Sequence, residues 1–236
     1  MPEWMVEEGA LDPELALAGE ASATYRETSS PLDGFMAQQE IAVFLKPLVI
    51  NDTRKWFGEA DIRLDALVVQ GGNESGSLYA PHTFRFPRVA DGDDVAHTDN
   101  GLMIYYGRPK HFLALTLTLS RDTKDSDDLA ELISQQAERE DVASVLSRMT
   151  TAVASVQLAT VEVAMKAALA LGDVAYGLVR QISPKCLGLY RGNWLARKDN
   201  FGIGRHPPEG VVSIKDFMFA YEVVPDRAEP GLVTED

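Results

Sequence analysis

Apolar and polar residues alternate at every second position along several segments of the first half of the chain. In residues 61–70, Ile62, Leu64, Ala66 and Val68 fall on one face of an extended backbone, with Arg63 and Asp65 on the other. Related patterns occur at residues 40–50, 82–86, 102–106 and 112–119. A period of two is that of a strand with one buried face, so each of these segments is predicted to be a strand.

The last two of these segments, 102–106 and 112–119, are joined by a short connection that contains Gly107 and Pro109. Both residue types are typical of tight turns. Because a short turn brings consecutive strands side by side, this pair predicts a hairpin.

The hydrophobic period changes after residue 120. Asp125, Ser126, Asp127 and Asp128 offer N-cap side chains and first-turn acids, which predict a helix over 127–138. A longer helical pattern follows over 141–182, where apolar residues recur at alternating spacings of about four and three. Neighbouring positions are apolar as well, so the buried arc is wide. This pattern indicates helix packed on a sheet or on a partner helix, and it fits one bent helix or two.

Residues 150–179 are rich in Ala, Val and Leu, which raises the question of a membrane span. Glu162, Lys166 and Asp173 lie within this stretch. Each charge would cost roughly 2.5–3.5 kcal/mol at the centre of a bilayer. The segment is therefore predicted not to cross a membrane.

Strand patterns return at 186–190 and again, as one long strand, at 211–224. With the earlier segments they make about eight strands, mostly joined by short turns. The predicted fold is α+β, mainly an antiparallel β-sandwich with a long helical insertion, at about 125–182, before the last strands. It forms a single domain over 39–224, between a mobile acidic leader (1–38) and an acidic tail (225–236).

The chain is acidic, with 36 Asp and Glu against 22 Lys and Arg and a formal net charge of −14. Such a charge repels phosphate backbones, which disfavours nucleic acid as a partner and allows an anionic membrane only through a bound cation. Cys186 is the only cysteine, so no internal disulfide can form. The first residues lack the basic and apolar regions of a signal peptide. Together these features predict a cytoplasmic protein.

Carboxylates gather in two loops that flank predicted strands. Asp52 and Asp61 lie around the first loop, and Asp91 and Asp93 lie in the loop after residue 90. Calcium prefers six to eight hard oxygen ligands, so these four residues predict a calcium site. Their spacing is not that of an EF-hand, and a solvated acidic turn explains the same residues without a metal.

Two short stretches resemble parts of a C2 domain. Residues 51–61 are similar to its first loop, and residues 197–204 are similar to the Asp-Asp-Phe-Ile-Gly stretch beside its third loop. The resemblance implies an eight-stranded sandwich, which in many members binds calcium and acidic lipid at these loops. Where a calcium-binding member has Asp-x-Asp, this chain has Leu189–Arg191, which cannot ligate calcium. The resemblance thus favours a scaffold or protein-binding role over a working calcium site.

The loop around residues 201–208 is a second candidate site. Arg197, Asp199, Arg205 and His206 surround two glycines there, and such a loop on a rigid sandwich could bind an anionic ligand or an acidic partner. A long connection between the last strands explains the same residues without a ligand.

Two functions of different classes lead among those that the sequence leaves open, ahead of a membrane-active effector that would release its helix. The first is a non-catalytic interaction or scaffold module that binds calcium or a protein partner through its loops, or associates with itself through the helix at 141–182. The alternative is a hydrolase-type enzyme with a dispersed site that uses His97 and His206 with Asp93 or Asp199. No Gly-x-Ser-x-Gly, His-Glu-x-x-His or phosphate-loop motif supports the alternative.

Overall fold

The computed structural model describes residues 40–71, 78–96, 98–123, 126–154, 158–183 and 185–226, apart from the side chains at 141, 152–160, 162 and 197. The predicted leader and nearly all of the predicted tail lie outside these residues. The strands are β1 (Ile41–Ile50), β2 (Ala60–Gln70), β3 (Tyr79–Val89), β4 (Leu102–Gly107), β5 (Phe112–Arg121), β6 (Cys186–Leu195), β7 (Gly204–His206), β8 (Val212–Ile214) and β9 (Phe217–Pro225). The helices are α2 (Leu129–Gln136), α3 (Glu140–Ala154), α4 (Leu158–Ile182), the short α5 (Ala196–Asp199) and the 3-10 turn η2 (Asn200–Gly202).

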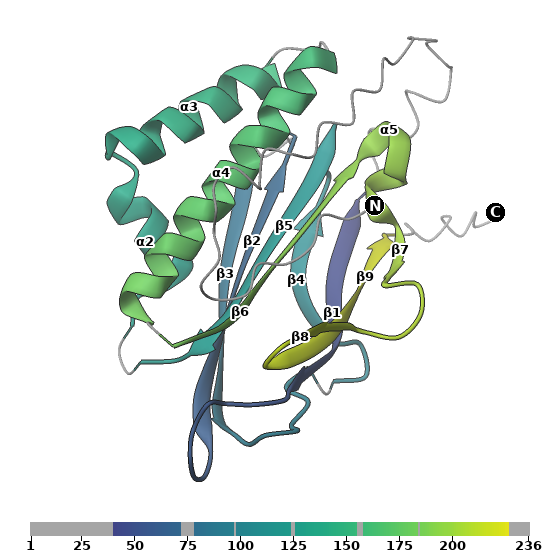
Figure 1. Ribbon diagram of the computed structural model, residues 1–236. Coiled ribbons are helices and arrows are strands. Elements are labelled where there is room, and N and C mark those ends of the chain that lie inside the picture. The colour runs from purple at the N-terminus through teal and green to yellow at the C-terminus, as the bar shows by residue number, and fades with distance from the viewer. Residues whose placement is uncertain are drawn as a thin grey trace, which may run out of the picture.

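The described strands form two antiparallel sheets, as Figure 1 shows. In the first sheet the order is β4-β1-β9-β7, and β8 also pairs with β9. In the second sheet the order is β3-β2-β5-β6. Helices α2, α3 and α4 lie between β5 and β6 in the sequence. The predicted fold class, an α+β sandwich with a helical insertion before the last strands, is confirmed.

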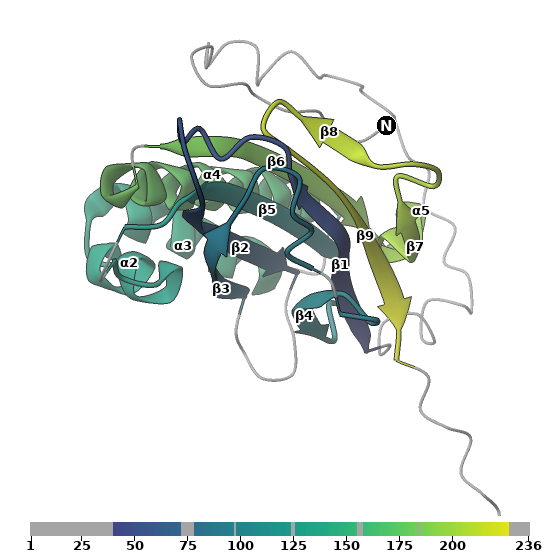
Figure 2. The same cartoon turned by 90° about the horizontal axis from the view of Figure 1, so that it is seen from below.

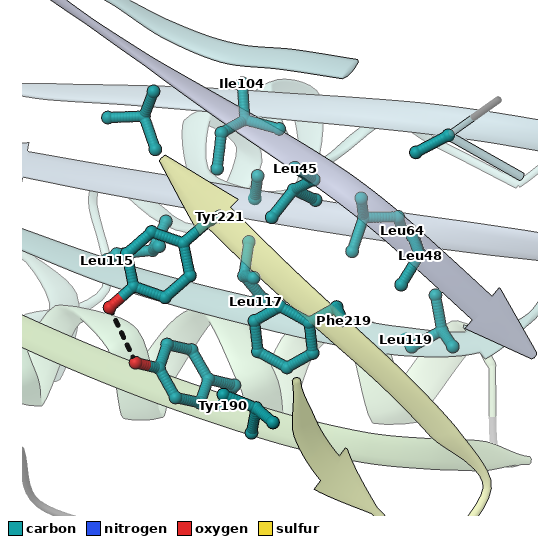
Figure 3. Close-up of a cluster of buried hydrophobic side chains, with 14 of the residues drawn as sticks. Leu45, Leu48, Leu64, Ile104, Leu115, Leu117, Leu119, Tyr190, Phe219 and Tyr221 are labelled. Carbon is teal, nitrogen blue, oxygen red and sulfur yellow. Dashed lines mark hydrogen bonds between the residues drawn. The ribbon is translucent and has the colours of Figure 1, made fainter. Parts of the chain in front are cut away.

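The main core lies between the two sheets, and Figure 3 shows part of it. Leu64, on the predicted apolar face of β2, packs there with residues such as Leu45 of β1 and Leu117 of β5. Two tyrosines from opposite sheets, Tyr190 and Tyr221, share a hydrogen bond of 2.9 Å between their hydroxyl groups. Both hydroxyl groups are thereby satisfied inside an apolar core, which makes their burial tolerable.

A second core lies on the other face of the second sheet, under the helices (Figures 1 and 2). Leu67 of β2 and Phe112 of β5 point into it and meet apolar residues of α2 and α4, such as Leu171. Helix α4 comes close to β5 at Gly172, where a Cβ atom would lie 2.6 Å from Thr116 Oγ1. The central strands β2 and β5 are therefore covered on both faces, and the predicted packing of the long helical segment on a sheet is confirmed.

A buried ion pair lies on this helix-facing side of β2. Arg63 Nε and Nη2 donate to the two oxygens of Asp65 at 2.7 and 2.8 Å, and Thr83 Oγ1 donates to Asp65 Oδ1 at 2.6 Å. Arg63 Nη1 also donates to Ser126 Oγ and to the carbonyl of Asp127, just before α2. The polar face that the sequence shows on β2 is thus fully buried, and it holds the start of the helical layer.

Two local predictions change in the structure, and one open question is answered. The predicted hairpin is wrong, because β4 pairs with β1 in the first sheet whereas β5 lies between β2 and β6 in the second. The predicted strand at 211–224 is divided into β8 and β9 by a turn at Lys215 and Asp216. For residues 141–182 the sequence fits one bent helix or two, and the structure shows two, α3 and α4, which pack against each other.

Within the part of the chain that the structure describes, none of the helices has the length and apolar character that crossing a membrane requires. The charges that interrupt residues 150–179 account for this result.

Candidate interaction surface

The loop between β1 and β2 presents two adjacent aromatic side chains to solvent. Trp56 is 94% exposed and Phe57 is 84% exposed, far above any other large apolar side chain among the described residues. The loop extends beyond the ends of the strands at the bottom of Figure 1. We call Trp56 and Phe57 the aromatic tip.

The first half of this loop is tied to the neighbouring loop between β3 and β4. Thr53, which is almost fully buried, donates both its backbone N–H and its hydroxyl group to Asp91 Oδ1, at 2.8 and 2.9 Å. These two donors lower the pKa of Asp91, because they stabilise its charged form. The carboxylate is therefore ionised at neutral pH and holds the loop in place.

A second tie comes from the turn between β8 and β9. The carbonyl of Asp216 accepts hydrogen bonds from the backbone N–H groups of Asn51 at 2.7 Å and Asp52 at 3.1 Å. The nearly buried Asp216 carboxylate also forms an ion pair with Arg54. Arg54 has a left-handed backbone, with φ of 53°, so the chain turns sharply just before the aromatic tip.

The second half of the loop is fixed where it enters β2. Lys55 Nζ donates to the carbonyl of Glu59, which closes the loop beneath the aromatic tip. Gly58 has φ of 75°, a conformation that side chains disfavour. Asp61 Oδ1 accepts the backbone N–H of Arg88 at 3.0 Å, which joins the end of the loop to β3. The aromatic tip is thus carried by a loop that is anchored on both sides.

An open recess of about 650 Å³ lies beside the loop. It is lined by Lys55, Gly58, Glu59, Ala60, Asp61, Arg88, Arg121 and Asp122. Three of these side chains are basic and three are acidic, so the recess is formally neutral in a chain whose net charge is −14.

The three carboxylates of the recess have partners within the protein. Asp61 accepts the backbone N–H of Arg88, Asp122 Oδ2 lies 3.2 Å from Arg85 Nε, and Glu59 Oε2 lies 4.0 Å from Arg88 Nε. The Arg121 side chain, by contrast, forms neither a hydrogen bond nor an ion pair with any residue that the structure describes. The positive charge of Arg121 is therefore available to an external anion.

The predicted calcium ligands lie at this same end of the sandwich. Asp52 Oδ1 accepts the N–H of Arg54 at 2.6 Å, and Asp93 Oδ2 accepts the N–H of Ala90 at 2.8 Å. Asp61 and Asp91 accept the hydrogen bonds given above. The described residues contain no group of three or more His, Cys, Asp or Glu side chains that could hold a metal ion. The structure shows these carboxylates as caps of loops and turns, and calcium binding stays a prediction.

The predicted binding residues around 197–206 follow the end of β6 that lies away from the aromatic tip. Asp199 Oδ2 accepts the N–H of Leu195 at 3.0 Å, and Arg205 Nη2 donates to the carbonyl of Gly210 at 2.9 Å. The ring of His206 stacks on Tyr221, and its Nε2 lies 2.5 Å from the carbonyl oxygen of Gly202. The side chain of Arg197 lies outside the described residues. Each of the other three side chains has a role in shaping its own loop.

The residues named for an enzyme are not brought together by any contact among the described residues. His206 and Asp199 have the separate local partners just described, and Asp93 belongs to the other end of the molecule. His97 lies outside the described residues. The hydrolase-type alternative therefore stays a prediction without geometric support.

The two C2-like stretches lie at opposite ends of the second sheet. Residues 51–61 lead into β2 beside Arg121, the last residue of β5, whereas residues 197–204 follow Leu195, which pairs with Phe112 at the start of β5. The two stretches therefore cannot contribute to one loop cluster. The likeness to a C2 domain stays a prediction.

Trp56 and Phe57 were not predicted as functional residues. Their signal in the sequence is an aromatic pair inside a charged loop, between Lys55 and Gly58 and outside the alternating pattern of either neighbouring strand. Arg121 carried no signal, because its place beside this loop depends on the pairing of β5 with β2.

Comparison of the chain with protein-family models, curated proteins and solved structures finds no match.

Proposed function

We propose that the chain is a non-catalytic interaction module that binds a protein partner through the aromatic tip. The observation that carries this proposal is the exposure of Trp56 and Phe57 on a loop fixed by Asp91 and Asp216. Exposed aromatic side chains of this size are typical of the residues that contribute most to protein interfaces.

Physical chemistry favours this surface over the others in the molecule. Burying an aromatic side chain removes roughly 150–250 Å² from water, which is worth about 4–6 kcal/mol before the costs of association. A loop that is already held in place loses little conformational entropy on binding. Many apolar residues of 141–182, the segment predicted for self-association, pack on the second sheet or between α3 and α4.

The test is a selection of binding peptides from a random display library, with the full chain as bait. The variant Trp56→Ser/Phe57→Ser serves as the counter-selection. Met103→Ser/Val163→Ser is the matched control, because it removes two other exposed apolar side chains from β4 and α4. We expect peptides that bind the wild-type chain and the control but bind the tip variant at least 100-fold more weakly.

The melting temperature of each variant must stay within about 2 °C of the wild type, since both changes are at exposed positions. If every selected peptide binds the tip variant as well as the wild type, the aromatic tip is not an interaction site and the proposal fails.

A further inference from the structure

We infer that the partner segment which covers the aromatic tip carries a carboxylate that binds Arg121 in the adjacent recess. This inference rests on the proposed function and adds the chemistry of the partner. The partner is a mainly apolar peptide segment with one or two acidic residues.

The first step of the argument is the position of Arg121. It lines the recess together with Lys55, Gly58 and Glu59, which directly flank the aromatic tip in the chain. A segment that packs on Trp56 and Phe57 can therefore extend into the recess that Arg121 lines. The Arg121 guanidinium offers a planar set of donors that matches a carboxylate, and Lys55 adds a second positive charge to the recess.

The second step is that the acidic side chains beside Arg121 already have partners within the protein. Asp61 and Asp122 are already hydrogen-bonded or ion-paired within the protein, and Glu59 lies at the edge of pairing distance from Arg88. Because the Arg121 side chain has no such partner among the described residues, an incoming anion does not need to displace an existing one. The backbone N–H of Arg121 donates a hydrogen bond of 3.0 Å to the carbonyl of Lys185. The Arg121 side chain therefore extends from an ordered strand end.

The third step limits the charge of the partner. The chain has a net charge of −14, and the long-range repulsion of a ligand grows with the ligand's own negative charge. A nucleic acid or an anionic membrane would bring many charges to a recess that is formally neutral. A peptide with one carboxylate gains the contact with Arg121 while it suffers little repulsion. The charge balance therefore favours a sparsely acidic peptide over a polyanion.

The experiment is a double-mutant cycle between the protein and one selected peptide. Affinities are measured by calorimetry for the wild-type chain and for Arg121→Gln, each with the acidic peptide and with its Glu→Gln counterpart. We expect Arg121→Gln to weaken the acidic peptide roughly 10- to 100-fold, the loss typical of a hydrogen bond to a charged group. Replacing Glu by Gln in the peptide should weaken its binding to the wild-type chain by a similar factor. The same replacement should leave the affinity for Arg121→Gln almost unchanged.

Arg148→Gln is the matched control, because Arg148 is an exposed arginine of α3, away from the recess. It should leave every affinity unchanged. Peptides that require Trp56 but bind Arg121→Gln as tightly as the wild type would overturn the inference and leave the proposed function standing. Tip-dependent binding of phosphatidylserine vesicles or of an oligothymidylate, tighter than that of any selected peptide, would also overturn it.

Discussion

Single residues decide how the helical layer is held on the sandwich. Arg63 and Asp65 are two residues apart on β2, and both side chains are almost fully shielded from water. Arg63 also reaches Ser126 and the carbonyl of Asp127 at the start of the helical layer. The pair thus links a central strand to the segment that leads into α2.

Removing one partner of this pair should be costly. Asp65→Ala leaves the Arg63 charge buried without its carboxylate, so we expect a loss of about 3–5 kcal/mol in the free energy of unfolding. Urea unfolding followed by circular dichroism measures this loss. Asp173→Ala, which removes the exposed partner of Arg191, should cost less than about 1 kcal/mol.

The double variant Arg63→Met/Asp65→Leu removes both charges together. It should be more stable than Asp65→Ala, because no uncompensated charge remains buried. A double variant less stable than Asp65→Ala would mean that Arg63 stabilises the fold mainly through Ser126 and Asp127.

The residue scale also shows a limit of prediction from sequence. The alternation in 61–70 correctly places Leu64 and Ala66 in the core between the sheets. It also suggests an exposed face for Arg63 and Asp65, since polar residues on alternate positions normally meet water. These two are buried because the helices, which come much later in the chain, cover that face. The periodicity of one strand cannot show that helices much later in the chain will bury its polar face.

At the scale of elements, α4 depends on a close approach to β5. Gly172 faces Thr116 so closely that an added Cβ would lie 2.6 Å from its hydroxyl oxygen. Gly177, in the same helix, is exposed and has no atom within 4 Å of the same added group. The two glycines therefore form a natural pair for comparison.

Alanine should have opposite effects at these two positions. Gly172→Ala forces α4 away from β5 and should cost about 1–3 kcal/mol of stability. Gly177→Ala only restricts the unfolded chain and improves helix propensity, so it should add about 0.5–1 kcal/mol. Chemical denaturation of both variants gives the comparison. Equal effects at the two positions would contradict the close contact between helix and sheet.

The elements themselves were better predicted than their partners. The strands at 40–50, 61–70 and 102–106 match β1, β2 and β4 closely, because alternation is a local property of each strand. The pairing of β4 with β1 could not be predicted in the same way. The short connection between β4 and β5 crosses from one sheet to the other, and turn residues alone do not distinguish such a crossing from a hairpin.

At the scale of the whole molecule, the space between the sheets contains buried tyrosines from both sides. Burial is the main cause that raises the pKa of Tyr105, Tyr190 and Tyr221 above the usual value near 10. These groups stay protonated in the folded state at a pH where the unfolded chain has lost those protons. The free energy of unfolding should therefore be unaffected below about pH 9 and should fall as the pH rises above 10.

Tyr105 and Tyr221, whose pKa values burial raises most, should each contribute about 1.4 kcal/mol to the loss of stability between pH 9 and pH 11. Tyr221→Phe removes one of these groups, so its stability should fall less steeply over that interval, although its stability at pH 8 is lower because Tyr190 loses its hydrogen-bond partner. Urea unfolding at several pH values measures both slopes. Identical slopes for the variant and the wild type would show that Tyr221 ionises normally in the folded protein.

The pairing of β1 with β9 joins the first described strand to the last one. During synthesis on a ribosome, the second sheet can pair β2, β3, β5 and β6 while β9 has not yet emerged. Until then, of the described strands only the short β4 is there to pair with β1, and the edge of β1 that β9 later covers stays open. The nascent chain therefore passes through a stage at which the β1 edge can pair with other chains, and the emergence of β9 ends this stage.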